Sequence, residues 1–488
     1  MKVSRRALLK LGVLGGAAVV LPVAPTVASF GKDQPAPSPR VPQFALPLAI
    51  PPVIRPARST ATTDFYEVTQ REARVEIIPG LKTTIWGYNG MFPGPTFRVR
   101  RGREIVVKQT NLLPDGVVVH QHGGVTPPDS DGYPTDLIPP GGSREYVYPN
   151  GHRAATMWYH DHAMGTTGFH NYLGLAGFYI VDDEADDRLP LPRGRYDVPL
   201  LIQDRRFAAD GSLVFDPLGH IGVIDGDVLL VNGVPWPRFE VANRKYRFRI
   251  LNGSNSTIFK LRLSSGQPLT QIATGGGLLP APVESPAIPL AMAERVEVVI
   301  DFSRYPIGSQ VTLQNLDGDG RLGQIMRFDV AREEPDDSAV PTTLRPIEQI
   351  PAVAAAHTRE WVFGPRVTLS AVPPVEWVIN GREFDPNRID ATPRLGEVEI
   401  WQIKNATALK IGGMDHPVHI HLVSFQILDR NGIKPAPYET GWKDTILVPK
   451  GEEARVIARF EGYRGKYIMH CHNLEHEDAA MMTNFEVV

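Results

Sequence analysis

The sequence predicts an all-β protein made of three similar β-sandwich units. Short segments alternate apolar with polar residues between turns rich in glycine and proline, as at residues 246–250 and 296–300. A period of two is typical of half-buried strands, and many short strands with regular turns favour a sandwich. No long stretch shows the period of a helix.

A long-range repeat predicts the number of units. An Asn-Gly pair, which is a strong turn signal, occurs three times, and each time a strand-like segment ends in asparagine 20 to 25 residues later. The pairs are Asn89-Gly90, Asn232-Gly233 and Asn380-Gly381, and the segments are residues 103–111, 245–252 and 397–405. The period is about 140 to 150 residues, a usual size for one domain. With boundaries at the polar stretches, the predicted domains are residues 59–185, 186–335 and 336–488.

Length and composition agree with a globular protein of several domains. A chain of 488 residues is too long for one core and suggests about three. Its 42% hydrophobic and 22% charged residues are ordinary values, and a net charge of −3 gives no sign of a nucleic-acid or anionic-membrane partner. The single cysteine excludes an internal disulfide.

The first residues predict an export signal. Residues 4–10 carry a twin-arginine pattern at Arg5 and Arg6, an apolar run follows over residues 11–23, and small residues surround Ala28. The run is short and broken by glycines, which disfavours a stable membrane anchor. We therefore expect residues 1–28 to be a signal read by the twin-arginine translocase, and the protein to be periplasmic or extracellular. Residues 29–58 are rich in proline and predict an extended arm.

The histidines are concentrated in pairs. Chance would give about 0.4 His-x-His pairs for this composition, yet the chain has four. They are His120/His122, His160/His162, His419/His421 and His470/His472. His416 and His476 stand close to two of these pairs, and we expect the four other histidines, at positions 152, 170, 220 and 357, to be surface or core residues.

Strand geometry divides these residues into two sites. Residues two apart on a strand point to the same face, with Cα atoms about 6.6 Å apart, so each pair of imidazoles can converge on one metal or on two adjacent metals. Cys471 lies between His470 and His472 and must point the other way. One predicted site is therefore mononuclear, and the other is a cluster of the eight paired histidines. The mononuclear site comprises Cys471, His416, His476 and Met481.

The donor atoms indicate the metal. A thiolate with imidazoles and a weak thioether selects copper, and an all-imidazole cluster suits copper too. Zinc sites seldom include methionine. We therefore expect copper in both sites.

Together these motifs resemble those of the multicopper oxidases, and the resemblance covers residues 60–488. The motifs are His120-Gln121-His122-Gly123, Trp158-Tyr159-His160-Asp161-His162, His416-Pro417-Val418-His419-Ile420-His421 and His470-Cys471-His472 with His476 and Met481. The resemblance implies three cupredoxin-like Greek-key β-sandwich domains and four copper ions. It implies a type 1 copper at His416, Cys471, His476 and Met481, a type 2 copper at His120 and His419, and a type 3 pair at the other six histidines. Residues 122–132, 160–165 and 174–179 are most similar to the branch that contains the bacterial spore-coat laccases, bilirubin oxidase and phenoxazinone synthase.

The resemblance also implies the reaction. A small reducing substrate, a phenol or an aromatic amine, gives single electrons to the type 1 copper near an exposed edge of His476. The electrons pass through Cys471 to His470 and His472, and four of them reduce dioxygen to water. Glu477 and Asp131 match positions that relay protons, although Glu477 has a local salt bridge or cap as its alternative role. Asp444 is expected to be a structural or supporting residue.

Several other functions are alternatives to this one. A cuprous or metal-ion oxidase, acting on Cu(I) or Mn(II), is the nearest alternative, but residues 345–415 contain one methionine, Met414, and no methionine-rich insert. A cupredoxin scaffold of cell division would lack metal ligands, and none is missing. A copper store or simple electron carrier would have no use for an eight-histidine site, and a copper nitrite reductase would have two such domains.

Overall fold

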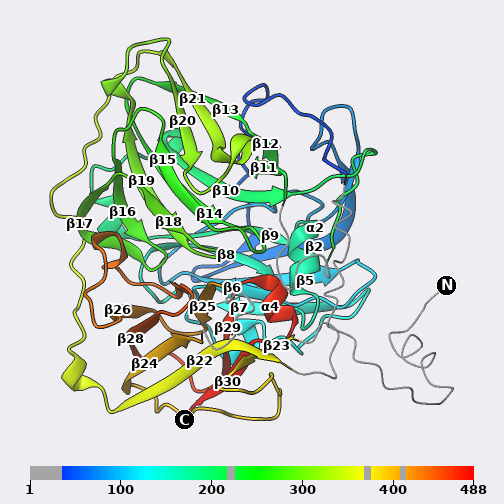
Figure 1. Cartoon of the computed structure of the whole chain (residues 1–488), viewed down its shortest axis with the longest axis vertical. Helices are drawn as coiled ribbons and strands as arrows, with labels where there is room; N and C mark the ends of the chain where they lie inside the picture. The colour runs from blue at the N-terminus through cyan, green and yellow to red at the C-terminus, as the bar shows by residue number, and fades with distance from the viewer. Residues whose placement is uncertain (1–35, 217–225, 368–374, 407–413) are drawn as a thin grey trace, which may run out of the picture. The chain divides into compact units, whose positions relative to one another are not determined.

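The computed structural model describes residues 36–216, 226–367, 375–406 and 414–488 (Figure 1). Two compact units divide the chain, Met1–Ala36 and Pro37–Val488, and the fold below is that of the second. The predicted signal, residues 1–28, and His220 lie outside the described residues. No helix in the described part of the chain is long and apolar enough to cross a membrane.

The first sandwich pairs two sheets within residues 58–182. The five-stranded sheet has the order β1-β2-β5-β7, with β3 on β2, and the four-stranded sheet has the order β4-β9-β8-β6. The strands are β1 (Arg58–Ser59), β2 (Thr63–Val75), β3 (Thr83–Tyr88), β4 (Phe97–Arg100), β5 (Glu104–Asn111), β6 (Val119–His122), β7 (Ser143–Tyr148), β8 (Ala155–Asp161) and β9 (Ala176–Asp182). Both sheets contribute to one buried core.

The second sandwich occupies residues 197–332. Its sheets have the orders β12-β11-β10-β14-β19-β16-β17 and β13-β21-β20-β15-β18. The strands are β10 (Asp197–Arg205), β11 (Val228–Val231), β12 (Val234–Pro235), β13 (Arg238–Ala242), β14 (Lys245–Asn252), β15 (Phe259–Leu263), β16 (Leu269–Thr274), β17 (Gly277–Ser285), β18 (Ile288–Leu290), β19 (Arg295–Asp301), β20 (Gln310–Asn315) and β21 (Gln324–Arg332). These two sheets also enclose a single core.

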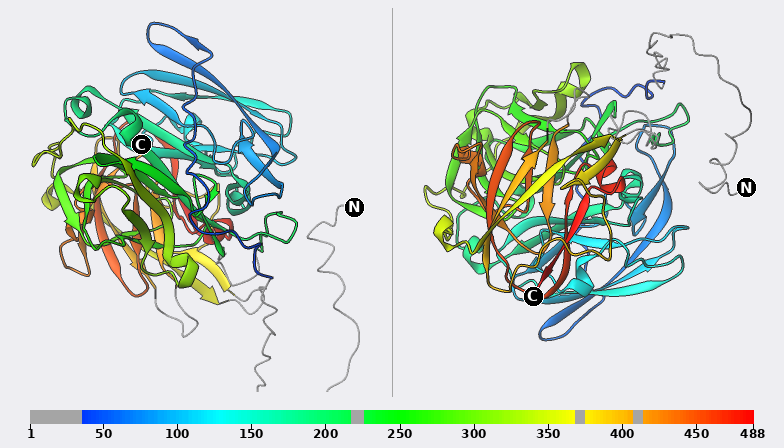
Figure 2. Two further views of the ribbon diagram at one scale, coloured as in Figure 1. Left: turned by 90° about the horizontal axis from the view of Figure 1, so that it is seen from above. Right: turned by 60° about the horizontal axis from the view of Figure 1, so that its bottom comes forward.

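The third sandwich occupies residues 357–487 and is coloured yellow to red in Figures 1 and 2. Its sheets have the orders β23-β22-β24-β28-β26 and β27-β25-β29-β30. The strands are β22 (His357–Val367), β23 (Val375–Ile379), β24 (Val398–Asn405), β25 (His416–Ile420), β26 (Phe425–Arg430), β27 (Thr445–Val448), β28 (Glu453–Arg459), β29 (Gly465–Cys471) and β30 (Met482–Val487). The α-helices of the described residues are short: α1 (Pro128–Asp131), α2 (Thr167–Leu173), α3 (Glu184–Asp187) and α4 (Leu474–Asp478). The all-β prediction is confirmed, and the domain boundaries stay predictions.

The Asn-Gly repeat has the same structural role in each sandwich. The asparagines of the three pairs, at positions 89, 232 and 380, have φ of 56°, 51° and 51°, as a left-handed turn requires. Each side-chain oxygen accepts a hydrogen bond from a strand N–H, that of Thr69, Leu201 or Val362. The strands that end in asparagine are β5, β14 and β24. They pair in parallel with β2, β10 and β22, respectively, which lie before the Asn-Gly turn in the chain.

The polar face of the second sandwich is more buried than the sequence predicts. The alternation at residues 246–250 predicts a half-buried strand, yet Arg247 is 6% and Arg249 2% exposed. Arg249 Nε donates to Asp197 Oδ1 over 2.7 Å, and its Nη1 donates to Glu297 Oε1 over 3.0 Å. The prediction of a solvent-facing side is therefore wrong, because these side chains form ion pairs beneath the first sandwich instead of meeting water.

The described part of the predicted arm runs along the second sandwich and then the first. The Phe44 N–H donates to Trp236 O and the Leu48 N–H to Arg238 O, each over 2.8 Å. Further on, the Ile54 N–H donates to Thr96 O over 2.9 Å. This segment, dark blue in Figures 1 and 2, therefore joins two sandwiches through backbone hydrogen bonds.

Candidate metal centres

Two antiparallel strand pairs place the paired histidines side by side. In the first sandwich β6 pairs with β8, and the register sets His120 opposite His160. In the third sandwich β25 pairs with β29, and His419 stands opposite His470. Because neighbouring strands are about 4.8 Å apart, each strand pair presents four imidazoles on one face.

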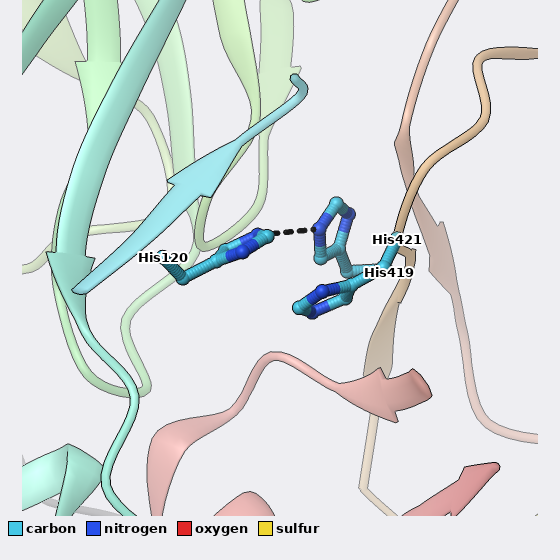
Figure 3. A group of neighbouring side chains, drawn as sticks. All are labelled: His120, His419 and His421. Atoms are coloured by element: carbon cyan, nitrogen blue, oxygen red, sulfur yellow. Dashed lines mark hydrogen bonds between the residues drawn. The ribbon is translucent and has the colours of Figure 1, made fainter. Parts of the chain in front are cut away.

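All eight predicted cluster histidines come together between the first and third sandwiches. His120 Nε2 lies 3.3 Å from His419 Nε2, and His162 Nε2 lies 3.3 Å from His470 Nε2. Figure 3 shows the ring of His120, on β6, directed toward His419 and His421 across the gap. Each of the eight rings is at most 1% exposed. Residues some 300 positions apart in sequence therefore line one buried centre, as the motifs predict.

The hydrogen bonds of these rings leave nitrogen lone pairs directed at the centre. His160 Nδ1 lies 2.9 Å from Asp161 O, and His419 Nδ1 lies 2.8 Å from Asp444 O. A carbonyl can only accept, so Nδ1 carries the proton and Nε2 carries the lone pair. Burial, with His162 nearby, lowers the pKa of His160 to about 3, which keeps the ring neutral. Neutral imidazoles with unpaired buried nitrogens are what a bound metal ion requires.

His122 has the opposite arrangement. Its Nε2 lies 3.1 Å from Asp444 Oδ1 and 3.0 Å from Thr445 Oγ1, while its Nδ1 has no partner among the described residues. His122 therefore offers Nδ1 to a metal. Its ring lies 5.7 Å from that of His160 and 5.0 Å from that of His472, and its ligand atom lies close to those of His120 and His160. His162, His421 and His470 form a second group of three.

The predicted mononuclear site also assembles. Cys471 Sγ lies 3.4 Å from His416 Nδ1 and 3.6 Å from His476 Nδ1. Met481 is fully buried in the same core, and its backbone oxygen accepts a hydrogen bond from the Cys471 N–H over 3.1 Å. Burial raises the pKa of the Cys471 thiol well above its usual range, so a metal ion is needed to hold the thiolate there.

Three carboxylates orient the cluster rings. Asp131 Oδ2 lies 2.7 Å from His421 Nδ1. Glu477 bridges two rings, with Oε2 3.0 Å from His470 Nδ1 and Oε1 3.3 Å from His162 Nδ1. Burial raises the pKa of Asp131 to about 8. Burial would also raise the pKa of Glu477, but the two imidazoles outweigh it and lower that pKa to about 2.

Asp444 is the third carboxylate, and its support comes from the second sandwich. Arg295 Nη1 donates to Asp444 Oδ1 over 2.7 Å, and its Nη2 donates to Oδ2. Burial alone would raise the pKa of Asp444, but the Arg295 guanidinium outweighs burial and lowers that pKa to about 2. The supporting role of Asp444 was predicted, but Arg295 was not, because β19 also carries Glu297 and Asp301 and a further charged residue in it gives no distinctive signal.

Two tryptophans that received no role in the sequence analysis pack on the ligand rings. Trp158 stacks on His160 with ring centroids 4.2 Å apart. Trp377 stacks on His476 with centroids 3.8 Å apart, and His476 is 0% exposed. The expectation that an edge of His476 is exposed is therefore wrong, because the indole covers the imidazole.

The histidines outside both sites agree with their expected roles where they are described. His170 is buried, and its Nδ1 lies 2.7 Å from Asp161 Oδ1. The side chain of His357 is 60% exposed. His152 is partly buried and bonds to the Arg153 backbone oxygen.

These donors define a copper protein with a thiolate centre and a histidine cluster, and comparison with known proteins gives its family. Multicopper oxidase family models match residues 69–186 and 358–488. The laccase of Bacillus subtilis (strain 168) is 37% identical over 91% of this chain and 98% of its own length. The bilirubin oxidase of Albifimbria verrucaria is 39% identical over 92% of this chain and 82% of its own. A crystal structure of the laccase from Pediococcus acidilactici Pa5930 matches with a TM-score of 0.85 and 33% identity, covering 93% of this chain and 95% of that one.

The chain belongs to the multicopper oxidase family. It is therefore a copper-binding oxidoreductase that uses dioxygen. The likeness to solved multicopper oxidases confirms the predicted cupredoxin-like β-sandwich domains.

Proposed function

We propose that this protein is a laccase-like oxidase that takes single electrons from phenols or aromatic amines and delivers four to dioxygen. The observation that carries the proposal is the presence of both donor sets, one on each face of β29. The similarity to a laccase and a bilirubin oxidase over most of the chain supports the same substrate class.

We propose four copper ions. His416, Cys471, His476 and Met481 would hold the first, His120 and His419 the second, and the remaining six cluster histidines a pair. When copper is bound, the thiolate centre takes up electrons singly, and the cluster collects the four that convert one dioxygen and four protons into two waters. The scaffold alternative is not favoured, since every ligand position is filled.

The backbone of β29 provides the electron path. Cys471 faces the core of the third sandwich, while His470 and His472 face the cluster. One peptide unit on each side therefore links the thiolate to a cluster imidazole through covalent bonds. This path needs no direct contact between the two sites.

Asp131 and Glu477 have positions that suit two tasks. Asp131 accepts from His421 Nδ1, and a Glu477 oxygen lies 3.0 Å from His470 Nδ1, so the first task is to fix the ring tautomer and leave Nε2 for the metal. The second task is the proton relay predicted from the family resemblance. Four protons are consumed for each dioxygen, and we propose that these two carboxylates stand on their route.

Oxygen uptake by the copper-loaded protein tests the function. A phenol, an aromatic amine and Cu(I) would be compared as reductants, with and without added Cu(II). Fast uptake with the organic donors, unaffected by Cu(II), supports the proposal. Fast uptake with Cu(I) alone, increased by excess copper, would favour the cuprous oxidase. Residues 345–415 offer that alternative one methionine, Met414.

Two variants make the same assay specific to the sites. Cys471→Ser should abolish the blue absorption of the copper–thiolate bond and all turnover, while the histidine cluster still binds copper. His160→Asn should keep the blue absorption but lose oxygen uptake. Turnover by either variant at the wild-type rate would contradict the assignment of its site.

We also propose export by the twin-arginine route, to the periplasm or the cell exterior, supported by the sequence of residues 4–28. Replacing Arg5 and Arg6 together by lysine should retain the precursor inside the cell. Cell fractionation and immunoblotting would measure the export. Unchanged export of the variant would contradict the proposal.

A further inference from the structure

Trp377 forms the outer wall of the thiolate centre. Its indole stacks on the imidazole of His476, with ring centroids 3.8 Å apart and an angle of 27° between the planes. The same indole meets His416 edge-on, at 5.7 Å and 76°. One side chain therefore touches both imidazoles of the site, and neither contact was visible in the sequence.

Burial leaves the indole as the outermost conjugated group of this site. Cys471, His416, His476 and Met481 are each 0% exposed, whereas Trp377 is 5% exposed. Trp377 lies on β23, which is the edge strand of its sheet, and its neighbours Val375 and Glu376 are partly exposed. A donor that approaches this face meets the indole before any ligand of the metal.

We propose that Trp377 is the electron-entry residue, and that an aromatic reductant gives its electron to His476 through the indole. This inference rests on the proposed function. One electron leaves the donor, and a phenol also releases its hydroxyl proton to water. With copper bound, the electron would cross the indole to the His476 imidazole and lower the oxidation state of the copper by one, so the indole would be unchanged overall.

The contact favours planar aromatic donors. Aromatic rings pair with an indole through its face or edge, with centroids within about 7 Å, so a phenol or aryl amine gains both binding and contact with the electron path. A small hydrated or complexed ion gains no such pairing. Trp377 therefore also determines specificity among reductants.

Three variants separate electron entry from simple packing. Trp377→Leu keeps an apolar side chain but removes the conjugated ring, and Trp377→Phe restores a smaller ring. Trp361→Leu is the matched control, since Trp361 is a buried tryptophan on the adjacent strand β22 whose ring packs against Trp401. All three should keep the blue absorption, because no ligand changes.

The measurement is anaerobic stopped-flow bleaching of the blue absorption, with a methoxylated phenol and with hexacyanoferrate(II) as donors. The reduction potential of each variant is obtained by redox titration. Trp377→Leu should slow reduction by the phenol roughly fivefold or more, the value of one lost aromatic pair, and more than its potential explains. Trp377→Phe should recover most of that rate, and hexacyanoferrate(II) should be affected much less.

Two results would overturn the inference while leaving the proposed function intact. In the first, Trp377→Leu is reduced by the phenol as fast as Trp361→Leu or the wild type. In the second, both donors slow equally and in proportion to a changed potential, which would make Trp377 a cover that excludes water. A wild type that Cu(I) reduces but phenols do not would instead overturn the proposed function, and the inference with it.

Discussion

Asp444 shows how a residue that donates to no metal holds the cluster in place. Its backbone oxygen fixes His419, its carboxylate lies 3.1 Å from His122 Nε2, and the same carboxylate pairs with Arg295. The side chains of Asp444 and Arg295 are 3% and 1% exposed, so this ion pair is shielded from solvent. Three sandwiches therefore meet at one side chain.

Asp444→Asn should destabilise the protein and loosen the cluster. The neutral amide leaves the buried Arg295 guanidinium without a charged partner, which costs about 3 kcal/mol in the free energy of unfolding. It also replaces one carboxylate oxygen by an NH2 group and removes the negative charge, which weakens the hydrogen bond that directs His122. Denaturant unfolding of the metal-free protein and the copper content after dialysis would measure the two effects.

Glu76→Gln is the control for this substitution. Glu76 forms an exposed ion pair with Lys82, with side chains 49% and 56% exposed, and solvent weakens such pairs. Its stability and copper content should match the wild type. A similar loss in both variants would contradict the special role of Asp444.

The grouping of the histidines was predictable from the sequence, whereas the long-range partners of Asp444 and the contact of Trp377 were not, for one physical reason. The histidine pairs recur at a spacing of two, which strand geometry converts directly into a shared face. His122 and Asp444, in contrast, are 322 residues apart, and Arg295 and Asp444 are 149 apart. Trp377 likewise reaches His476 only after the third sandwich has folded. Contacts of this kind leave no periodic signal.

At the scale of elements, the arm stabilises the second sandwich through a few buried side chains. Val41 is 2% exposed and belongs to the core of that sandwich, whereas Val53, in the same arm, is 52% exposed. Composition predicts an extended arm, since proline disfavours helix and ladder pairing. It does not say which apolar residues of the arm find a core.

Val41→Ala and Val53→Ala form a matched pair of variants. The first should lower the free energy of unfolding by about 2 kcal/mol, because two methyl groups leave a packed core. The second should change it by less than about 0.5 kcal/mol, as usual for surface positions. Thermal and urea unfolding would compare them, and equal values would mean that the arm does not pack as described.

Strand alternation illustrates the same division between predictable and unpredictable features. Positions, turns and the threefold repeat of strands follow from local patterns such as Asn232-Gly233 and Asn252. Burial of the polar face does not follow from such patterns, because the first sandwich covers Arg249. Alternation shows that one face of a strand is polar and the other apolar. Whether the polar face contacts water or another sandwich depends on how the whole chain packs.

At the scale of the whole molecule, a buried ion network joins the first and second sandwiches. Asp197 accepts from Arg249 of its own sandwich over 2.7 Å and from Arg98 of the first sandwich over 2.8 Å. Burial alone would raise the pKa of Asp197, but Arg249 and Arg247 outweigh it, and the pKa lies well below its ordinary value. The charged form is therefore the one that stabilises the fold.

This pKa predicts how stability depends on pH. A depressed pKa contributes stability above the pKa of the unfolded state, about 3.9 for aspartate, and this contribution is lost as pH falls. Asp197→Asn should therefore lose about 3 kcal/mol at neutral pH, and its difference from the wild type should shrink as the pH falls below about 4.

Urea unfolding of the metal-free protein across this pH range would test the prediction. Glu184→Gln serves as the control, because Glu184 forms a surface pair with Arg188, with side chains 80% and 78% exposed. It should change stability little at any pH. A difference for Asp197→Asn that grows on acidification would contradict the sign argued here.

The split origin of the histidine cluster makes copper a reporter of complete folding. Half of its rings come from residues 120–162 and half from residues 419–472. Each half alone offers only part of the ligand set, so the complete cluster forms only when the distant ends of the chain have docked. By linkage, bound copper in turn stabilises that docked state in proportion to the logarithm of its concentration over its dissociation constant. Retention of the full metal complement thus reports that the sandwiches have docked, and a chain with the first or third sandwich misplaced should lose its cluster copper before it loses its strands.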